Sequence, residues 1–311
     1  MKKKLLLIYI FLAFMISSKS QQDAMFTYYM FNSQSINPAY VGSKDVVNVT
    51  MLNRSQWTGF EGAPWSHTIS LSTPLINESL GFGLSFSNDV IGPSTLNNFT
   101  LDFAYHLKLN NPNHRLSMGV KVGGNHARID LNSLELDNQN DPSFNVDNIG
   151  KFMPNYGFGL YYYTTKWYLG VSSPQLVNYD FNSSQRHYFV RAGAVFNITD
   201  NLKIRPSSFL KFTKNAASTL DLTGLLIFRD ETWAGFAFRA PVGIFVPTGS
   251  SGGGYAFLVG INLSDQLSVG YSFGYSVGNQ TFKFNNGSHE ITLRYDHIYE
   301  SKKIIKSPRY F

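Results

Sequence analysis

Apolar and polar side chains alternate with a period of two along most of this chain. In residues 80–87, leucine and phenylalanine alternate with glycine and serine, and residues 98–109 and 267–278 continue the alternation over longer runs. A helix would repeat its apolar positions every 3.6 residues, so the pattern predicts β-strands. Strands of soluble sandwiches average about five or six residues, whereas a tilted strand needs about nine to eleven to cross a bilayer. The long runs therefore favour a transmembrane β-barrel.

About fourteen segments carry this alternation. They are residues 45–54, 65–73, 79–88, 95–109, 114–129, 155–164, 166–173, 186–199, 202–213, 218–229, 231–244, 254–264, 266–278 and 289–300. Long adjacent segments of this kind, each followed directly by the next, are typical of an antiparallel up-and-down barrel.

The connections between these segments give an independent check. With a periplasmic N-terminus, every second connection should be a tight turn. Those connections are all short, at residues 74–78, 110–113, 165, 200–201, 230 and 265. The other set contains the three longest gaps, at residues 130–154, 174–185 and 279–288, although its member near Asn215 is short. The parity predicts an all-β, closed barrel of outer-membrane type with its long loops outside.

The composition agrees with this fold class. The 311 residues include 26 phenylalanines, 18 tyrosines and no cysteine, and only 15% are charged. Aromatic residues are enriched where barrels meet the membrane interfaces. The lack of cysteine excludes a disulfide framework, a cysteine-based metal site and an acylated lipoprotein N-terminus. The net charge of +6 comes with no recognisable nucleic-acid reader motif, so we expect no nucleic-acid partner.

The two ends of the chain differ from the barrel. Residues 1–20 read as a signal peptide, with Lys2–Lys4 before a short apolar run and small residues before Gln21. Residues 21–44, rich in aromatic side chains, form an extended lead-in that packs at the barrel base or plugs it. Residues 45–300 form the barrel, and residues 301–311 form a basic periplasmic tail. We therefore expect an exported protein of the outer membrane, in contact with its lipid.

Candidate catalytic groups do not converge. Ser288, His289 and Glu290 are the residue types of a catalytic triad, but adjacent strand residues point to opposite faces. The glycine-rich residues 249–254 lack the lysine and helix of a phosphate loop. Residues 130–147 hold several Asp and Asn residues without EF-hand spacing, which leaves calcium binding as an alternative to a solvated loop. We predict a protein that is not an enzyme, with no cofactor, no metal site and no small-molecule substrate.

Charged residues recur on the polar parity of the strands. They are Asp102, Lys121, Arg191, Lys203, Arg205, Lys211, Asp221, Arg239, Glu290 and Arg294. A charge that faces lipid near the midplane costs up to a few kcal/mol, so these side chains should face the lumen. A lumen filled by paired charges is one interpretation. Because basic residues dominate the set, an anion-selective channel is the other.

Four short motifs lie at strand–loop junctions. They are Asn37-Pro38-Ala39, Arg54-Ser55-Gln56-Trp57, Asn88-Asp89-Val90-Ile91-Gly92-Pro93 and Ser288-His289-Glu290-Ile291. In this order they resemble the PorP/SprF family of outer-membrane proteins, which belongs to the type IX secretion system of the Bacteroidota. The resemblance covers essentially the whole mature chain.

The resemblance implies an outer-membrane barrel that supports protein secretion and surface attachment, often with gliding motility. Its partners would be a periplasmic lipoprotein ring, a secreted adhesin, or both. The alternative function is a channel of the porin or fatty-acid-transporter type. The family motifs mark Asn37, Pro38, Arg54, Gln56, Trp57, Asp89, Gly92, His289 and Glu290 as structural or partner-binding candidates. The basic tail adds Lys302, Lys303, Lys306 and Arg309 as candidate docking residues.

Two strand ends suggest one specific contact. Arg54 shares its parity with Asn48 and Thr50, and Glu290 shares its parity with Arg294, so both should face the lumen. The first and last strands of a closed barrel are neighbours. We therefore predict an ion pair between Arg54 and Glu290 across the closing seam.

Overall fold

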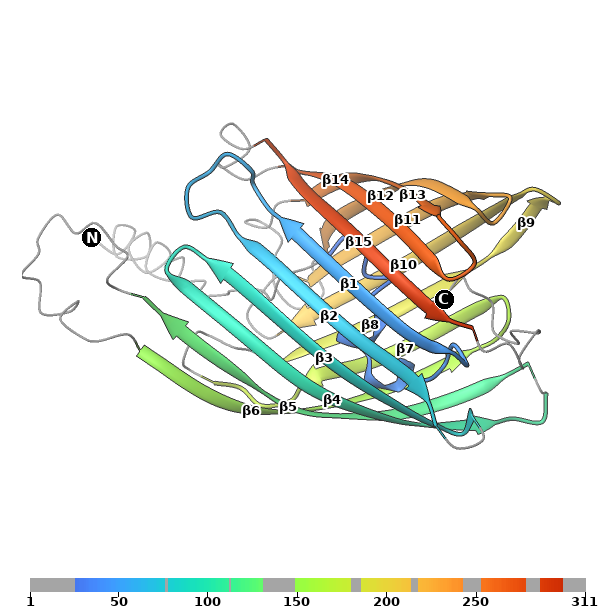
Figure 1. Cartoon of the computed structure of the whole chain (residues 1–311), viewed down its shortest axis with the longest axis horizontal. Coiled ribbons are helices and arrows are strands. Elements are labelled where there is room, and N and C mark those ends of the chain that lie inside the picture. Colours follow the sequence, from blue (N-terminus) through green and yellow to red (C-terminus); the bar gives the residue numbers. More distant parts are fainter. Residues whose placement is uncertain are drawn as a thin grey trace, which may run out of the picture.

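The computed structural model describes residues 26–75, 78–111, 113–130, 149–179, 186–213, 218–242, 253–277 and 286–298. Its strands form one closed antiparallel barrel (Figure 1). The strands are β1 (Val47–Ser55), β2 (Trp65–Pro74), β3 (Leu80–Ile91), β4 (Ser94–Lys108), β5 (Arg115–Ile129), β6 (Ile149–Tyr163), β7 (Trp167–Gln175), β8 (His187–Ala194), β9 (Phe196–Thr199), β10 (Leu202–Thr213), β11 (Ser218–Phe228), β12 (Thr232–Val242), β13 (Gly253–Asn262), β14 (Leu267–Val277) and β15 (Ser288–His297).

The barrel has fourteen strands around its wall, as the sequence pattern predicts. β8 and β9 are two parts of one strand, interrupted at Val195, and both pair with β10. The ring closes through the pairing of β10 with β11 on one side and of β1 with β15 on the other. Each strand pairs with the strands before and after it in the chain, which is the up-and-down order.

Several strand boundaries differ from the prediction, and two of the differences change a connection. β3 ends at Ile91 and β4 begins at Ser94, so Gly92 and Pro93 make a tight turn in place of a longer loop. β6 begins at Ile149, six residues before the predicted start at residue 155. In both places the hydrogen-bonded ladder continues beyond the regularly alternating residues. Strand pairing there rests on main-chain bonds, which the apolar pattern does not report.

We call the two ends of the barrel the turn end and the loop end. The turn end holds the short connections and the start of β1, and the loop end holds the connections after β1, β3, β5 and the other odd-numbered members of the up-and-down order. In Figure 1 the turn end lies to the right, where the arrow of β15 points. Residues 131–148, which belong to the predicted outer loop 130–154, lie outside the described residues.

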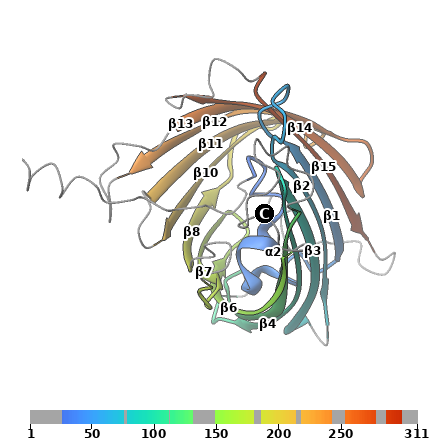
Figure 2. The same cartoon turned by 90° about the vertical axis from the view of Figure 1, so that its left-hand side faces the viewer.

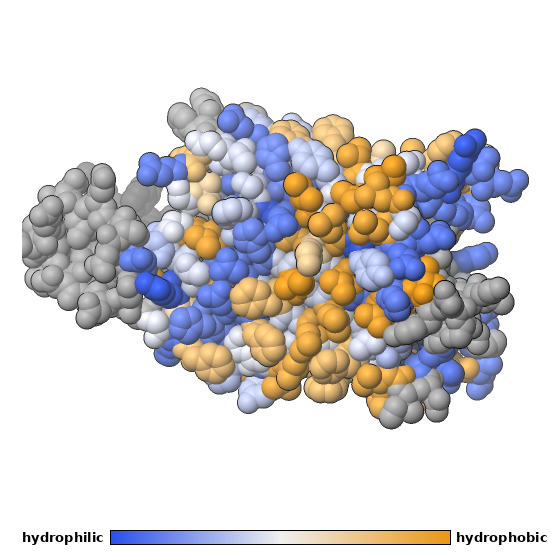
Figure 3. Space-filling model, viewed as in Figure 1, coloured by the Kyte–Doolittle hydropathy of each residue, from blue (hydrophilic) through white to orange (hydrophobic). Residues whose placement is uncertain are grey.

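The outer wall is apolar around its middle. Phe86, Phe99, Val122, Phe158 and Leu222 are exposed although the interior is rich in Ser, Thr and charged residues. Figure 3 shows an apolar band across the face in view, with hydrophilic residues toward both ends. Such an inverted distribution, apolar outside and polar inside, is that of a barrel embedded in lipid.

The N-terminal segment, residues 26–46, lies inside the barrel (Figure 2). The prediction that it is extended is wrong. It contains a helical turn, α2 (Ser33–Ile36), and a 3-10 turn, η1 (Pro38–Tyr40). Turns shorten the path of the chain and bring its aromatic residues against several strands at once. None of the helices in the described part of the chain is long and apolar enough to cross a membrane.

Candidate functional site: a lumen filled by the N-terminal segment

The N-terminal segment runs along the barrel axis from the loop end toward the turn end. Near its start, the backbone N–H of Thr27 donates to Glu290, which is the third residue of β15. Near its finish, Lys44 forms an ion pair with Asp296, close to the last residue of the same strand. The segment therefore begins and ends beside β15, crosses the lumen to strands such as β4 and β6 in between, and then reverses direction to enter β1.

The predicted ion pair at the seam is confirmed. Arg54 and Glu290 are register partners across β1 and β15, and Arg54 Nε lies 3.6 Å from Glu290 Oε1. The same carboxylate accepts the backbone N–H of Thr27 at 2.6 Å and of Tyr28 at 3.0 Å. Glu290 is only 1% exposed. One buried carboxylate thus joins the first strand, the last strand and the N-terminal segment.

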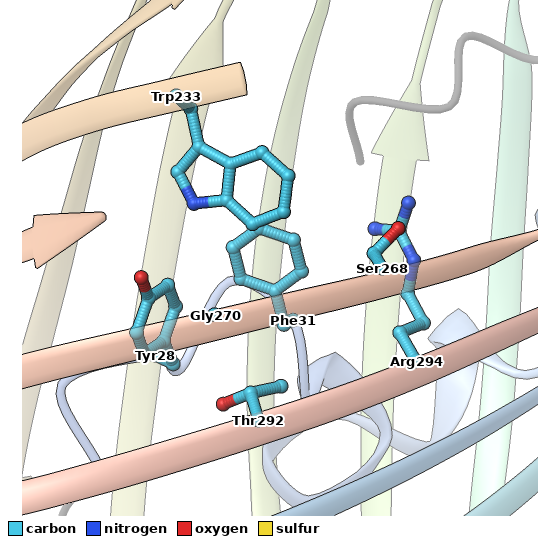
Figure 4. A pocket seen from close by; sticks show the side chains of 7 residues that line it. All are labelled: Tyr28, Phe31, Trp233, Ser268, Gly270, Thr292 and Arg294. Atoms are coloured by element: carbon cyan, nitrogen blue, oxygen red, sulfur yellow. The ribbon is translucent and has the colours of Figure 1, made fainter. Parts of the chain in front are cut away.

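Aromatic side chains anchor the start of the segment. The Tyr28 hydroxyl donates to the carbonyl oxygens of Val259 at 2.7 Å and Tyr271 at 3.0 Å, on two adjacent strands. Phe31 stacks on Trp233, with ring centroids 5.4 Å apart. Figure 4 shows these rings against the wall, with Arg294 beside them. The gap that they line is too small to hold a water molecule, so this part of the lumen is packed.

The Asn37-Pro38 motif seats the middle of the segment. Asn37 Oδ1 accepts the N–H of Ala39 at 2.9 Å, which caps η1, and Asn37 Nδ2 donates to the Leu160 carbonyl at 2.9 Å. Proline at the first position of η1 needs no hydrogen-bond acceptor. The motif therefore fixes the turn and attaches it to β6.

Two wall glycines make room for this motif. A Cβ at Gly159 would lie 2.0 Å from Asn37 Oδ1, and a Cβ at Gly119 would lie 2.3 Å from the Ala39 nitrogen. Both contacts are far shorter than van der Waals distance, so any side chain at either position would displace the segment. The glycines of the polar parity are thus part of the seat and not only small lumen residues.

A buried polar network holds α2. Gln34 Nε2 donates to Asp102 at 3.1 Å and to the Leu84 carbonyl at 3.1 Å. Lys121 forms an ion pair with Asp102 at 2.9 Å and donates to the Gln34 carbonyl at 3.4 Å. Asp102 is fully buried. Paired and hydrogen-bonded charges of this kind specify position more than they add stability.

The turn end is closed by further ion pairs. Arg115 lies 3.1 Å from Asp45, and Lys44 lies 3.5 Å from Asp296. His106 Nε2 donates to the Val41 carbonyl at 2.9 Å. Burial, reinforced by the nearby Arg294, lowers the pKa of Lys44 from 10.5 to about 7. Lys44 is therefore close to titrating under ordinary conditions.

Three of the four family motifs meet at the loop end. The connection at residues 56–64 bonds to the start of β15, where the Trp57 N–H donates to Ser288 Oγ at 3.4 Å. On its other side Gly62 accepts the N–H of Gly92 at 2.9 Å, and Gln56 donates to Pro64 at 2.9 Å. This connection therefore spans the outer side of the seam.

The remaining candidates fall in separate places. Asp89 is the register partner of Ser66 on the lumen parity, and Gly92 has a positive φ of 53° in its tight turn. His289 faces outward, where its Nδ1 lies 2.7 Å from the Tyr271 hydroxyl. Glu290 faces inward, so the two do not converge with Ser288 on one reacting atom. Lys302, Lys303, Lys306 and Arg309 lie outside the described residues.

The sequence did not reveal how the segment is held. Its anchors on the wall, such as Gly119, Gly159 and Ser172, belong to the polar parity and look like any lumen residue. Their one signal is the frequency of glycine at inward positions of β3, β5 and β6. Across the parts of the chain that are described, no three His, Asp or Glu side chains lie close enough to hold a metal ion.

These features define a class: a membrane-spanning β-barrel of the outer-membrane type, closed by its own N-terminal segment. Solved barrels share the fold. The chain is 10% identical to the Acinetobacter baumannii outer membrane protein Omp33, with a TM-score of 0.50 over 82% of this chain and 100% of that one. It is 10% identical to the CymD monoaromatic hydrocarbon channel, with a TM-score of 0.52 over 88% of this chain and 94% of that one. No curated protein sequence matches the chain.

The chain belongs to the PorP/SprF family. Residues 18–295 match the family described as type IX secretion system membrane protein PorP/SprF. The match covers the N-terminal segment and nearly all of the barrel. The protein is therefore an outer-membrane barrel of the type IX secretion system.

Proposed function

We propose that this barrel is a non-enzymatic anchoring component of the type IX secretion system. It would hold a secreted adhesin at the cell surface, dock the periplasmic lipoprotein ring, or do both, and so support gliding motility. The observation that carries the proposal is the N-terminal segment, whose aromatic rings and main chain are bonded to the wall from Glu290 to Asp296. A lumen filled in this way suits binding at its two ends better than conduction.

The loop end is the surface best suited to an exported partner. Its described connections are tied to each other, as in the bonds of Gly62 with Gly92 and of Thr58 with Gly287. They form a fixed rim that holds the family motif residues Trp57 and Gly92 in place. Rigid rims position binding groups with little ordering cost when a partner docks. We therefore assign the adhesin-facing role to this end.

A gene deletion tests the proposal most directly. We expect the inner-membrane motor to assemble normally and one partner adhesin to be missing from the cell surface. The measurement is protease accessibility or immunolabelling of surface adhesins on intact cells, with plasmid-borne wild type as the control. Normal surface display of every adhesin in the deletion strain would refute the secretion role.

The channel alternative makes a different prediction. If the barrel conducts, the purified protein in a planar bilayer should show large and stable openings. With the segment in place we expect little steady conductance. Anion-selective openings that persist in the wild-type protein would favour the channel function over anchoring.

The basic tail can be tested separately from barrel assembly. We expect that Gln at Lys302, Lys303, Lys306 and Arg309 reduces co-purification of ring lipoproteins, because screened charge attraction is lost. This variant keeps the length of the tail and Phe311, so an assembly signal at the end of the chain stays intact. Full recovery of the ring complex at normal barrel levels would exclude docking through these charges.

A further inference from the structure

A row of polar side chains crosses the outer surface of the barrel near the loop end. Its members belong to the lipid-facing parity of β1, β2, β3, β4 and β5, and each lies opposite the next in register. They are Asn53, His67, Asn88, Asn97 and His126. Each is the third or fourth residue from the loop end of its strand. We call these residues the outer polar row.

The members of the outer polar row bond to one another and keep groups that can bond elsewhere. The imidazole of His67 forms a hydrogen bond with the side chain of Asn53, and Asn88 Nδ2 donates to Asn97 Oδ1 at 2.8 Å. His126, at the end of the row, has no hydrogen-bond partner within the described part of the chain. Side-chain amides and imidazoles both donate and accept hydrogen bonds. The row therefore offers donors and acceptors to a molecule beside the barrel.

The surface changes in character on either side of this row. Toward the middle of the membrane lies an apolar row, whose members are between 41% and 52% exposed: Met51, Ile69, Phe86 and Phe99. Toward the loop end lies Trp65, which is 55% exposed and whose ring centroid is 4.6 Å from that of His67. Figure 3 shows hydrophilic residues beside the apolar band on this side. A membrane lipid presents its acyl chains and its headgroup in the same order.

The outer polar row occupies only part of the wall. On β11, β12, β13 and β14 the comparable register row is aliphatic and aromatic, and consists of Leu222, Phe238, Tyr255 and Tyr275. Aromatic girdles are usual where barrels meet the membrane interfaces, whereas polar side chains that face lipid are costly unless they have a partner. A girdle that only fitted the bilayer would be alike all round. The difference indicates a specific ligand on β1–β5.

We propose that the outer polar row binds the saccharide headgroup of a glycolipid in the leaflet at the loop end. The acyl chains of this lipid would lie along the apolar row. Sugar hydroxyls both donate and accept hydrogen bonds, as the amides and imidazoles do. A phosphate group would prefer lysine or arginine, and the row contains neither. The exposed ring of Trp65 adds apolar area against which one face of a sugar ring can pack.

The test is native mass spectrometry of the purified full-length mature barrel in a polyoxyethylene detergent, which carries no sugar that could compete. The probes are digalactosyldiacylglycerol and phosphatidylglycerol with the same acyl chains. We expect saturable binding of the galactolipid, at least tenfold tighter than that of phosphatidylglycerol. Equal affinity for the two lipids would overturn the proposal.

Variants locate the lipid. We expect Asn88→Leu combined with Asn97→Leu to weaken galactolipid binding at least tenfold and to leave phosphatidylglycerol binding unchanged. Leucine suits a lipid-facing position, so the barrel should still fold. The matched control is Tyr255→Leu on β13, an outward residue that is 40% exposed, which should bind like the wild type. If the double variant does not fold, His126→Leu decides, because that side chain has no bond within the described barrel to lose.

The same variants separate a lipid from a second copy of the chain. Unchanged galactolipid binding in both the double variant and His126→Leu would exclude the row as its site. The mass of the protein in lipid nanodiscs should be that of a single barrel for wild type and variants alike. A dimer that the double variant dissociates would assign the row to contact between copies and would also overturn the proposal.

Discussion

Arg54 and Glu290 lie opposite each other where the first strand meets the last, and the carboxylate of Glu290 also holds the backbone of Thr27 and Tyr28. Barrel closure and seating of the N-terminal segment therefore depend on one buried side chain. In a barrel with a free lumen, the two would be independent.

Removing the carboxylate of Glu290 should weaken both the closure of the barrel and the seating of the N-terminal segment. We expect Glu290→Ala to destabilise the folded barrel by about 3–5 kcal/mol, because it leaves Arg54 buried without its partner and two backbone N–H groups without an acceptor. The measurement is the fraction of heat-resistant barrel in gel mobility assays. Arg54→Ala combined with Glu290→Ala should cost less than the sum of the single changes. Additive costs would show that the two side chains do not interact.

A methyl group at one wall glycine should displace the segment. We expect Gly159→Ala to push Asn37 from its seat, since the new Cβ would lie 2.0 Å from Asn37 Oδ1. Overpacking of this kind costs about 1–3 kcal/mol. Ser33, which is 1% exposed in the segment, serves as the reporter when changed to cysteine in this cysteine-free chain. The cysteine should react with an impermeant thiol reagent only in the Gly159→Ala background.

The matched control for that experiment is Gly224→Ala. A Cβ at Gly224 on β11 would meet nothing within 4 Å, so the cysteine at position 33 should stay protected. Protection in both glycine variants would mean that the seat tolerates a side chain and that the segment is held by other contacts.

The orientation of the barrel follows from its connections. We expect the loop end to face the medium and the turn end to face the periplasm. Single cysteines at Glu61, in the connection after β1, and at Asn111, in the turn after β4, lie at exposed positions of opposite ends. On intact cells an impermeant reagent should label the first and not the second. The reverse labelling would invert the barrel and the assignment of its partner surfaces.

Lys44 should make stability depend on pH. Its pKa falls from 10.5 to about 7 in the folded protein, first because of burial. Between these values the unfolded chain binds more protons than the folded one, so stability should rise with pH from about 7 to 10.5. The slope from this group approaches about 1.4 kcal/mol per pH unit.

Lys44→Met isolates this contribution from the other titrating groups. The variant should show a flatter rise of its thermal midpoint over that pH range, while Asp296 keeps its contact with Arg294. The same slope in wild type and variant would show that Lys44 stays charged throughout.

The strands of the wall could be predicted from the sequence because each strand has one lipid face and one polar face. Leu80 to Phe86 alternate without interruption, and the structure places them in β3 as predicted. The ion pair at the seam could be predicted from strand parity alone, because parity shows that Arg54 and Glu290 both face the lumen. β6 began early because residues 149–154 pair with β5 through main-chain bonds, and their side chains carry little alternation.

The contacts inside the barrel could not be predicted from the sequence in the same way. The turns of the N-terminal segment are set by contacts with strands far away in the chain, such as Asn37 with Leu160 and Gln34 with Asp102. No local pattern records such contacts. The meaning of Gly119 and Gly159 likewise depends on what lies opposite them in the lumen, which period and composition do not contain.

The contact of Glu290 with the N-terminal segment also distinguishes the correct register of the last strand from shifted registers. A strand that slips by two residues keeps the same side chains on each face, so the polar and apolar pattern alone does not reject it. Such a slip of β15 would bring Ser288 or Thr292 opposite Arg54 in place of Glu290. Neither side chain offers a carboxylate to Arg54 or to the N–H groups of Thr27 and Tyr28. Only the correct register of the last strand therefore supplies a carboxylate both to Arg54 and to the N–H groups of the N-terminal segment.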